Sequence, residues 1–179
     1  MNTAEEKTQS LDKALKLLTY GNYIVTTRMP ANELETREKD YLAAGTVSWA
    51  MQSSFEPPML TIAIRKDSDL RETIERSGSF VLTILGKKDQ QLVGRFRGNS
   101  DISDDQINGI GYAKSPETGN PIIKTGIAYF ECEVSKRLES VGDHVLFIGR
   151  IVNVREQQKD NEPLYEWETG FQYGGVAFN

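Results

Sequence analysis

Two long segments in the second half of the chain alternate with the period of a β-strand, and they constrain the fold more than any other feature. From 127 to 134, apolar residues alternate with Glu131 and Glu133, so we expect a strand with one face in the core and both glutamates in solvent. From 145 to 154, both faces are largely apolar. Such a strand must be covered on both sides, by a barrel interior on one face and by a helix or a partner subunit on the other.

Shorter segments predict further strands and a few short helices. Strand patterns occur at 23–27, 45–51, 59–64 and 80–85. Helices with recognisable caps or stops are predicted over 10–18, 69–76 and 92–96. Because the strands do not alternate with long helices, we predict a mainly β fold, a small β-barrel with short helices. We expect one domain over residues 1–179, in which 1–9 and 28–41 are polar or charged and flexible.

Composition excludes several functional classes. The formal net charge is −5, which disfavours binding to nucleic acid or to an anionic membrane. The single cysteine, Cys132, and the single histidine, His144, rule out an internal disulfide and disfavour both a metal site and a Ser-His-Asp hydrolase. No apolar run approaches the ~20 residues of a membrane span, and the first ten residues are polar. We therefore expect a cytoplasmic protein with no metal, nucleic-acid or membrane partner.

The segment from Gly45 to Ser68 carries the most chemical information. Small donors and a carboxamide surround Trp49, namely Thr46, Ser48, Gln52, Ser53 and Ser54. Such groups suit a buried planar heterocycle with several ring heteroatoms. Arg65 and Lys66 then supply positive charge just before a predicted helix start, where an anion is favoured. On the residues alone, a solvated strand edge followed by an ordinary helix cap is the favoured interpretation, because a Ser/Thr-rich strand edge is common.

The order of motifs between Thr19 and Gly175 resembles the flavin reductase-like family. The matching segments are Thr46–Trp49, Gln52–Pro58, Lys66–Ser68, Ser77–Phe80, Gly119–Ile122, Glu131–Val134, Gly142–Arg150 and Gly170–Gly175. The resemblance is greatest to stand-alone FMN-type members and to the C-terminal reductase modules of diflavin flavoproteins. It implies an FMN-binding split β-barrel that forms a homodimer, with the flavin near the subunit interface.

The resemblance also assigns individual residues to the cofactor. The cofactor-binding positions it implies are Thr46, Ser48, Trp49, Ala50, Gln52, Ser53, Ser54, Ala63, Arg65, Lys66 and Ser68. The first four would follow the isoalloxazine and ribityl chain, and Lys66 and Ser68 would hold the phosphate. Two positions depart from the family pattern, because Leu70 replaces a frequent Thr and Thr83 replaces a frequent Asn.

His144 has two interpretations. It can be a strand-end imidazole hydrogen-bonded to a neighbour such as Asp143. In the family, the Gly-Asp-His segment lies where nicotinamide approaches the flavin, which makes His144 the candidate catalytic residue for positioning that substrate. Phe171 and Tyr173 can either cap the flavin ring or pack in the core.

The function implied is FMN-dependent NAD(P)H:flavin oxidoreduction. Hydride would pass from NADH or NADPH to FMN, and electrons would pass onward to a flavin, a partner such as a monooxygenase, or a metal acceptor. An FMN-binding electron carrier or sensor without nicotinamide turnover is the alternative from another class. A haem-handling protein on the same barrel, with His144 as ligand, is a third hypothesis.

Overall fold

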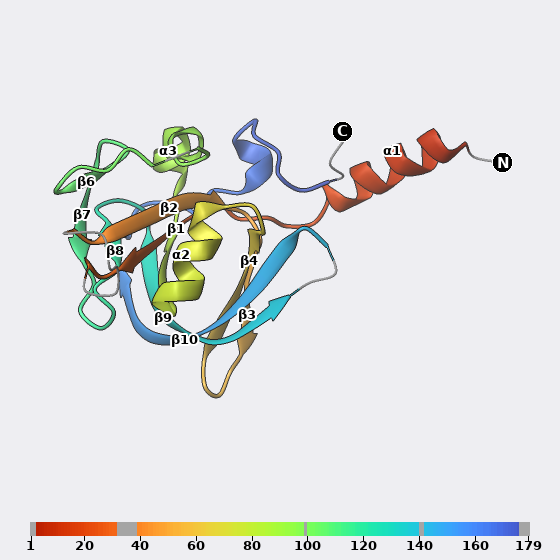
Figure 1. Cartoon of the computed structure of the whole chain (residues 1–179). Coiled ribbons are helices and arrows are strands. Elements are labelled where there is room, and N and C mark those ends of the chain that lie inside the picture. Colours follow the sequence, from red (N-terminus) through yellow and green to blue (C-terminus); the bar gives the residue numbers. More distant parts are fainter. Residues whose placement is uncertain (1–2, 32–38, 99, 140–141, 176–179) are drawn as a thin grey trace.

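A computed structural model describes residues 3–31, 39–98, 100–139 and 142–175 (Figure 1). The helices are α1 (Ala4–Leu15), α2 (Asp69–Ser77) and α3 (Gln90–Arg95), with short 3-10 turns η2 (Lys87–Asp89) and η3 (Glu166–Glu168). The first strands are β1 (Tyr23–Met29), β2 (Tyr41–Val47), β3 (Ala50–Ser54), β4 (Met59–Arg65) and β5 (Ser79–Ile84). The remaining strands are β6 (Gln106–Ile107), β7 (Ile110–Lys114), β8 (Pro121–Ile123), β9 (Ala128–Glu139) and β10 (His144–Glu156).

Seven of these strands form one antiparallel sheet in the order β2-β1-β5-β9-β10-β4-β3. The sheet curls on itself, because Val47 from one end and Ile62 from near the other share a single buried core with Phe80 and Phe147. Helix α2 packs against β1 and β2 and covers one opening of the barrel (Figure 1). The predicted mainly β fold with short helices is confirmed.

A second core lies outside the barrel wall. There α3 and the three-stranded sheet β6-β7-β8 cover the outer face of β1 and β2, with Ile24, Leu92, Phe96 and Ile123 buried together. The backbone N–H of Thr46 donates to the Phe96 carbonyl at 3.0 Å. The loop after α3 is thereby held against the free edge of β2, beside the cavity described below.

Strand β10 is apolar on both faces, as the sequence predicts. Val145 and Phe147 point into the barrel core and are 1% and 0% exposed. Leu146 and Ile148 lie on the opposite face and are only partly buried. The described residues therefore bury the first part of one face of β10 and leave an apolar strip at Leu146 and Ile148 on the other.

The prediction that Glu131 faces solvent is wrong. Its side chain is 0% exposed, because residues 115–120 fold over that face of β9. Carboxylate Oε1 accepts from the backbone N–H groups of Glu117 and Thr118 at 3.1 and 2.6 Å, and Oε2 accepts from Asn153 at 3.2 Å. Burial alone would raise the pKa of Glu131, but these hydrogen bonds outweigh it and lower the pKa.

The first helix starts earlier than the sequence analysis predicts. Thr3 and Glu6 form a capping box, so α1 begins at Ala4, and Ser10 lies inside it rather than at its start. Helix α1 projects away from the barrel (Figure 1). Its Leu11 side chain is 54% exposed.

The strands around β2 differ in their bounds from the segments predicted over 28–41 and 45–51. The extended segment 45–51 is two strands, because β2 ends at Val47 and β3 begins at Ala50. Within the predicted loop 28–41, β1 continues to Met29 and β2 begins at Tyr41, while 32–38 lie outside the described residues. The flexibility expected for 1–9 and 28–41 remains a prediction.

Candidate functional site

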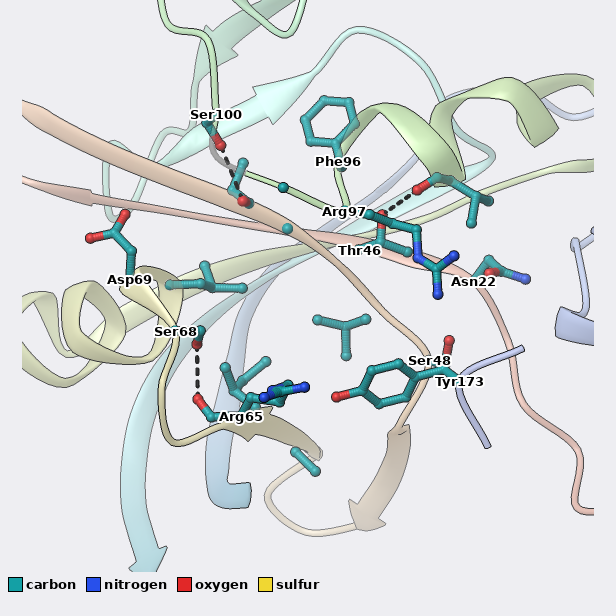
Figure 2. Close-up of a pocket in the computed structure, with 18 of the residues that line it drawn as sticks. Asn22, Thr46, Ser48, Arg65, Ser68, Asp69, Phe96, Arg97, Ser100 and Tyr173 are labelled. Atoms are coloured by element: carbon teal, nitrogen blue, oxygen red, sulfur yellow. Dashed lines mark hydrogen bonds between the residues drawn. The ribbon is translucent and has the colours of Figure 1, made fainter. Parts of the chain in front are cut away.

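A cavity of about 890 Å³ lies between the end of β4, the start of α2, strand β2 and the loop after α3 (Figure 2). Its size falls within the range of roughly 300–1,000 Å³ that small-molecule and cofactor sites occupy. In Figure 2, Ser68, Asp69 and Ser100 lie toward one side, and Ser48 and Tyr173 lie toward the other. We call these two sides the anion end and the ring end, after the chemistry described next.

The structure brings together five of the residues predicted to bind cofactor. Those that line the cavity are Thr46, Ser48, Ala63, Arg65 and Ser68. They meet because the backbone N–H of Ala63 donates to the carbonyl of Trp49 at 3.0 Å, which aligns β4 with the chain that follows β2. The remaining predicted residues lie outside the cavity lining: Trp49, Ala50, Gln52, Ser53, Ser54 and Lys66.

Lys66 is not part of the cavity lining. Its Nζ lies 3.9 Å from a carboxylate oxygen of Glu139, at the end of β9. Gln52 and Ser53 are exposed on β3. The roles that the resemblance implies for these residues remain predictions.

The anion end is built around the N-terminus of α2. Ser68 is the N-cap: its Oγ accepts from the Arg71 N–H at 3.2 Å and donates to the Arg65 carbonyl at 2.9 Å. This cap confirms the helix start near Asp69. The guanidinium of Arg65 donates to both carboxylate oxygens of Asp67, at 2.9 and 2.6 Å, which lowers the pKa of Asp67. A helix N-terminus beside an arginine is a favourable place for a phosphate group.

The sequence analysis missed a second arginine at this cavity. Phe96, Arg97 and Ser100 reach the cavity from the loop after α3. The Arg97 guanidinium lies 4.9 Å from the ring centroid of Phe171, and Ser100 Oγ donates to the Ala44 carbonyl at 3.1 Å. The only local signal for this loop is the predicted helix end before Gly98, which says nothing about which strand the loop would contact.

The ring end is an aromatic cluster made by four separate segments. Trp49 lies with its ring centroid 4.5 Å from that of His144, 5.3 Å from that of Tyr173 and 6.4 Å from that of Tyr20. The indole Nε1 of Trp49 is buried and has no hydrogen-bond acceptor among the described residues. Flat apolar surfaces and an unused N–H donor suit a planar heterocycle that carries acceptor atoms.

His144 connects this cluster to a carboxylate. Its Nδ1 lies 2.6 Å from Asp143 Oδ1, and its Nε2 lies 2.6 Å from the Tyr173 hydroxyl. Because a carboxylate only accepts, Nδ1 donates to Asp143, and an Nε2 that carries no proton accepts from the phenol. The Asp143 interaction predicted from the sequence is confirmed, and Tyr173 is the partner that the sequence did not predict. The hydrogen bond from His144 lowers the pKa of Asp143, and burial raises the pKa of Tyr173.

The described residues fit a flavin mononucleotide and give no site for a metal. The side chains of Thr46, Ser48 and Tyr173 in the cavity lining suit the ring, while Arg65 and the α2 N-terminus suit the phosphate. Within the described residues, no group of three or more His, Cys, Asp or Glu side chains is placed to hold a metal ion. No helix in the same part of the chain has the length and apolar character needed to cross a bilayer.

Comparison with known proteins identifies the family. Residues 15–175 match the family model described as the flavin reductase like domain. The chain therefore belongs to the flavin reductase-like family, which confirms the resemblance drawn from its motifs.

Sequence relatives include modules of larger proteins. Diflavin flavoprotein A 1 of Synechocystis is 30% identical over 146 residues, which are 81% of this chain and 24% of that protein. HsaB of Rhodococcus jostii, the reductase subunit of a flavin-dependent monooxygenase, is 34% identical over 126 residues, or 66% of this chain and 60% of HsaB. The chain thus spans about a quarter of the length of the diflavin flavoproteins that it matches.

Solved structures show the same fold at low sequence identity. Nitrilotriacetate monooxygenase component B of Mycobacterium thermoresistibile has a TM-score of 0.72 at 24% identity, covering 96% of this chain and 88% of that one. The NADH:FAD oxidoreductase of Streptomyces globisporus has a TM-score of 0.71 at 18% identity, covering 91% and 90%. The fold is accordingly the split β-barrel of flavin reductases.

Proposed function

We propose that this protein is an FMN-dependent NAD(P)H:flavin oxidoreductase. Hydride would pass from NADH or NADPH to FMN, and electrons would then pass to a free flavin, a protein or a metal acceptor. The observation that carries the proposal is one cavity with an arginine-flanked helix N-terminus at one end and, at the other, Tyr173, which contacts His144 and Trp49 just outside the lining. Family membership supports it, as does the Streptomyces globisporus relative, whose structure holds NAD and FAD fragments.

In this proposal the chain binds FMN along the length of the cavity. The N-terminus of α2 and Arg65 would hold the phosphate through charge-assisted contacts. Thr46 and Ser48 would follow the ribityl chain and the ring, against the small side chain of Ala63. The bound flavin supplies the hydride-accepting chemistry, and the protein supplies orientation and electrostatics.

His144 would position the nicotinamide. Its ring is held between Asp143 and Tyr173 and lies against Trp49, so its orientation is fixed by hydrogen bonds and by packing. A fixed imidazole can orient a carboxamide group through Nε2 once the Tyr173 hydroxyl moves aside. The second candidate function rests on the same contact: because Tyr173 occupies Nε2, an FMN-binding electron carrier or sensor without nicotinamide turnover is the alternative.

We further propose a homodimer. Directly paired residues of antiparallel strands share a face, so Leu146 lies beside Ala63, and Ile148 lies beside Thr61. Leu138, paired with Leu146, extends this outer face. A partly buried apolar face that continues into the cavity wall at Ala63 would be covered by a second copy, which would also close the ring end.

The proposed activity also suggests a domain organisation, a cellular location and an electron acceptor. Residues 1–179 would form one domain, located in the cytoplasm where NAD(P)H and free flavin are available. The physiological acceptor would be a monooxygenase component or another electron-accepting protein, as the names of HsaB and nitrilotriacetate monooxygenase component B suggest.

One experiment tests the proposal. The purified protein is titrated with FMN, FAD and riboflavin by flavin fluorescence and then supplied with NADH or NADPH under anaerobic conditions. Tight FMN binding followed by bleaching of the flavin absorbance with either nicotinamide supports the reductase. A flavin that dithionite reduces and neither nicotinamide reduces supports the carrier, and absence of flavin binding contradicts both.

A further inference from the structure

Glu166 is a buried carboxylate at the ring end that no part of the proposed function uses. It belongs to η3 and is 5% exposed, yet it lines the cavity together with Asn22. Its own N–H donates to the Tyr20 carbonyl at 2.9 Å, and the neighbouring Leu164 carbonyl accepts from the Asn22 N–H at 3.1 Å. The position of the Glu166 backbone is therefore fixed by the segment between α1 and β1.

Only one of its two carboxylate oxygens is used by the described chain. Oε1 accepts from the backbone N–H groups of Tyr173 and Gly174, at 2.9 and 3.0 Å. Oε2 is buried and has no hydrogen-bond partner among the described residues. A buried acceptor without a donor is costly, and such groups in native proteins call for an explanation.

Anchoring the C-terminal segment does not explain a carboxylate here. Oε1 alone accepts both backbone N–H groups, so a glutamine oxygen could accept the same two hydrogen bonds without a buried charge. No ion pair to Glu166 occurs within the described part of the chain. The charge also acts unfavourably on a neighbour, since burial and then Glu166 together raise the pKa of Tyr20.

We propose that Oε2 of Glu166 accepts a hydrogen bond from an amide-type N–H of the heterocycle bound at the ring end. Two ligands of the proposed function carry such a group: the imide N–H of the flavin ring and the carboxamide N–H of nicotinamide. Glu166 is then a specificity-determining residue, because a ligand without that N–H leaves the buried oxygen unpaired. This inference rests on the proposed function and adds a selective contact to it.

The variant Glu166→Gln tests this role with little change in shape. The glutamine oxygen must keep accepting from Tyr173 and Gly174, so its NH₂ takes the place of Oε2 and presents a donor where the ligand needs an acceptor. Glu168→Gln is the matched control, because Glu168 is a carboxylate of the same turn that lies outside the cavity lining. It accepts a hydrogen bond from the Tyr165 N–H and forms an ion pair with Lys87. If Glu166→Gln does not fold, Glu166→Asp is the second variant, because its side chain is one methylene shorter and moves the carboxylate away from the ligand.

Two pairs of probes separate the possible N–H donors. Dissociation constants are measured for FMN and 3-methyl-FMN, whose imide N–H is blocked. Values of kcat/KM are measured for NADH and for reduced 3-acetylpyridine adenine dinucleotide, which has no carboxamide N–H. The first preference ratio is the dissociation constant of 3-methyl-FMN divided by that of FMN, and the second is kcat/KM for NADH divided by kcat/KM for the acetylpyridine analogue. We expect one of these two ratios to fall about tenfold or more in Glu166→Gln, relative to wild type and to Glu168→Gln.

The outcomes are distinguishable. A fall in the first ratio identifies the flavin as donor, and a fall in the second identifies the nicotinamide; either supports the proposal. If wild type binds FMN and both ratios are unchanged in a folded Glu166→Gln or Glu166→Asp variant, the proposal is overturned while the proposed function stands. If wild type binds no flavin, the proposed function fails and this inference fails with it.

Discussion

The two ends of the cavity differ in how the chain builds them. The anion end is almost local: Arg65, the Ser68 cap and the start of α2 lie within a few residues of one another. The ring end combines Tyr20, Trp49, His144 and Tyr173 from four distant parts of the chain. The contrast teaches that charge recognition at this site is encoded by neighbouring residues, whereas ring recognition depends on the whole barrel.

The largest expected effect tests the positive charge at the anion end. Arg65→Met removes a guanidinium from the cavity lining, and we expect FMN affinity to fall about ten- to a hundredfold, since a hydrogen bond to a charged group contributes about 1.5–3 kcal/mol. Riboflavin has no phosphate, so its affinity should change little. Fluorescence titration of both ligands measures the difference.

Two further variants sharpen that result. Arg76→Met removes an exposed charge from the last turn of α2, away from the cavity, and serves as the matched control. Lys66→Met tests the residue that the resemblance assigns to the phosphate and that the structure places beside Glu139. If Lys66→Met weakens FMN binding and Arg65→Met does not, our assignment of the anion end is wrong.

At the ring end, His144→Ala should separate binding from turnover. We expect FMN affinity to stay within about twofold of wild type and kcat/KM for NAD(P)H to fall about tenfold, because one orienting hydrogen bond is lost. Stopped-flow reduction of the bound flavin measures the second quantity. Unchanged kinetics would leave His144 as a structural residue between Asp143 and Tyr173.

A smaller change is expected for Tyr173→Phe, which keeps the ring and removes the hydroxyl bonded to His144 Nε2. If Tyr173 blocks nicotinamide, KM for NAD(P)H should fall while FMN affinity is retained. The lost hydrogen bond should lower the free energy of unfolding by about 1 kcal/mol. A raised KM would show instead that the hydroxyl assists nicotinamide binding.

The smallest effect concerns pH. The hydrogen bond from His144 lowers the pKa of the exposed Asp143, so the folded state favours the ionised carboxylate. Its contribution to stability is present above the pKa of an unfolded aspartate and is lost as the pH falls through the lower folded value. Urea unfolding of wild type and Asp143→Asn between neutral and acidic pH measures this contribution. The free energy of unfolding should decrease less with falling pH in the variant than in wild type. Identical pH profiles would contradict this coupling.

Local patterns predicted most of the strands correctly, because alternation along one segment reports which side is buried. Leu60, Ile62 and Ile64 are buried on one face of β4 as expected. The same reasoning gave a wrong prediction for Glu131, which occupies a polar position of an alternating strand and is therefore expected to face solvent. Its burial depends on residues 115–120 closing over β9, and nothing within β9 encodes that contact.

The sequence by itself determined the barrel strands, the capped helix after β4 and the family, because these depend on periodicity, on caps and on motif order along the chain. Only the tertiary structure decided which groups share the cavity. In the structure Lys66 lies outside the cavity lining, near Glu139. Arg97 from the loop after α3 lines the cavity, and so do Glu166 and Tyr173 at the ring end. The physical reason is that side chains remote in sequence meet only when the sheet curls and the C-terminal segment folds back on it, and no local pattern specifies those contacts.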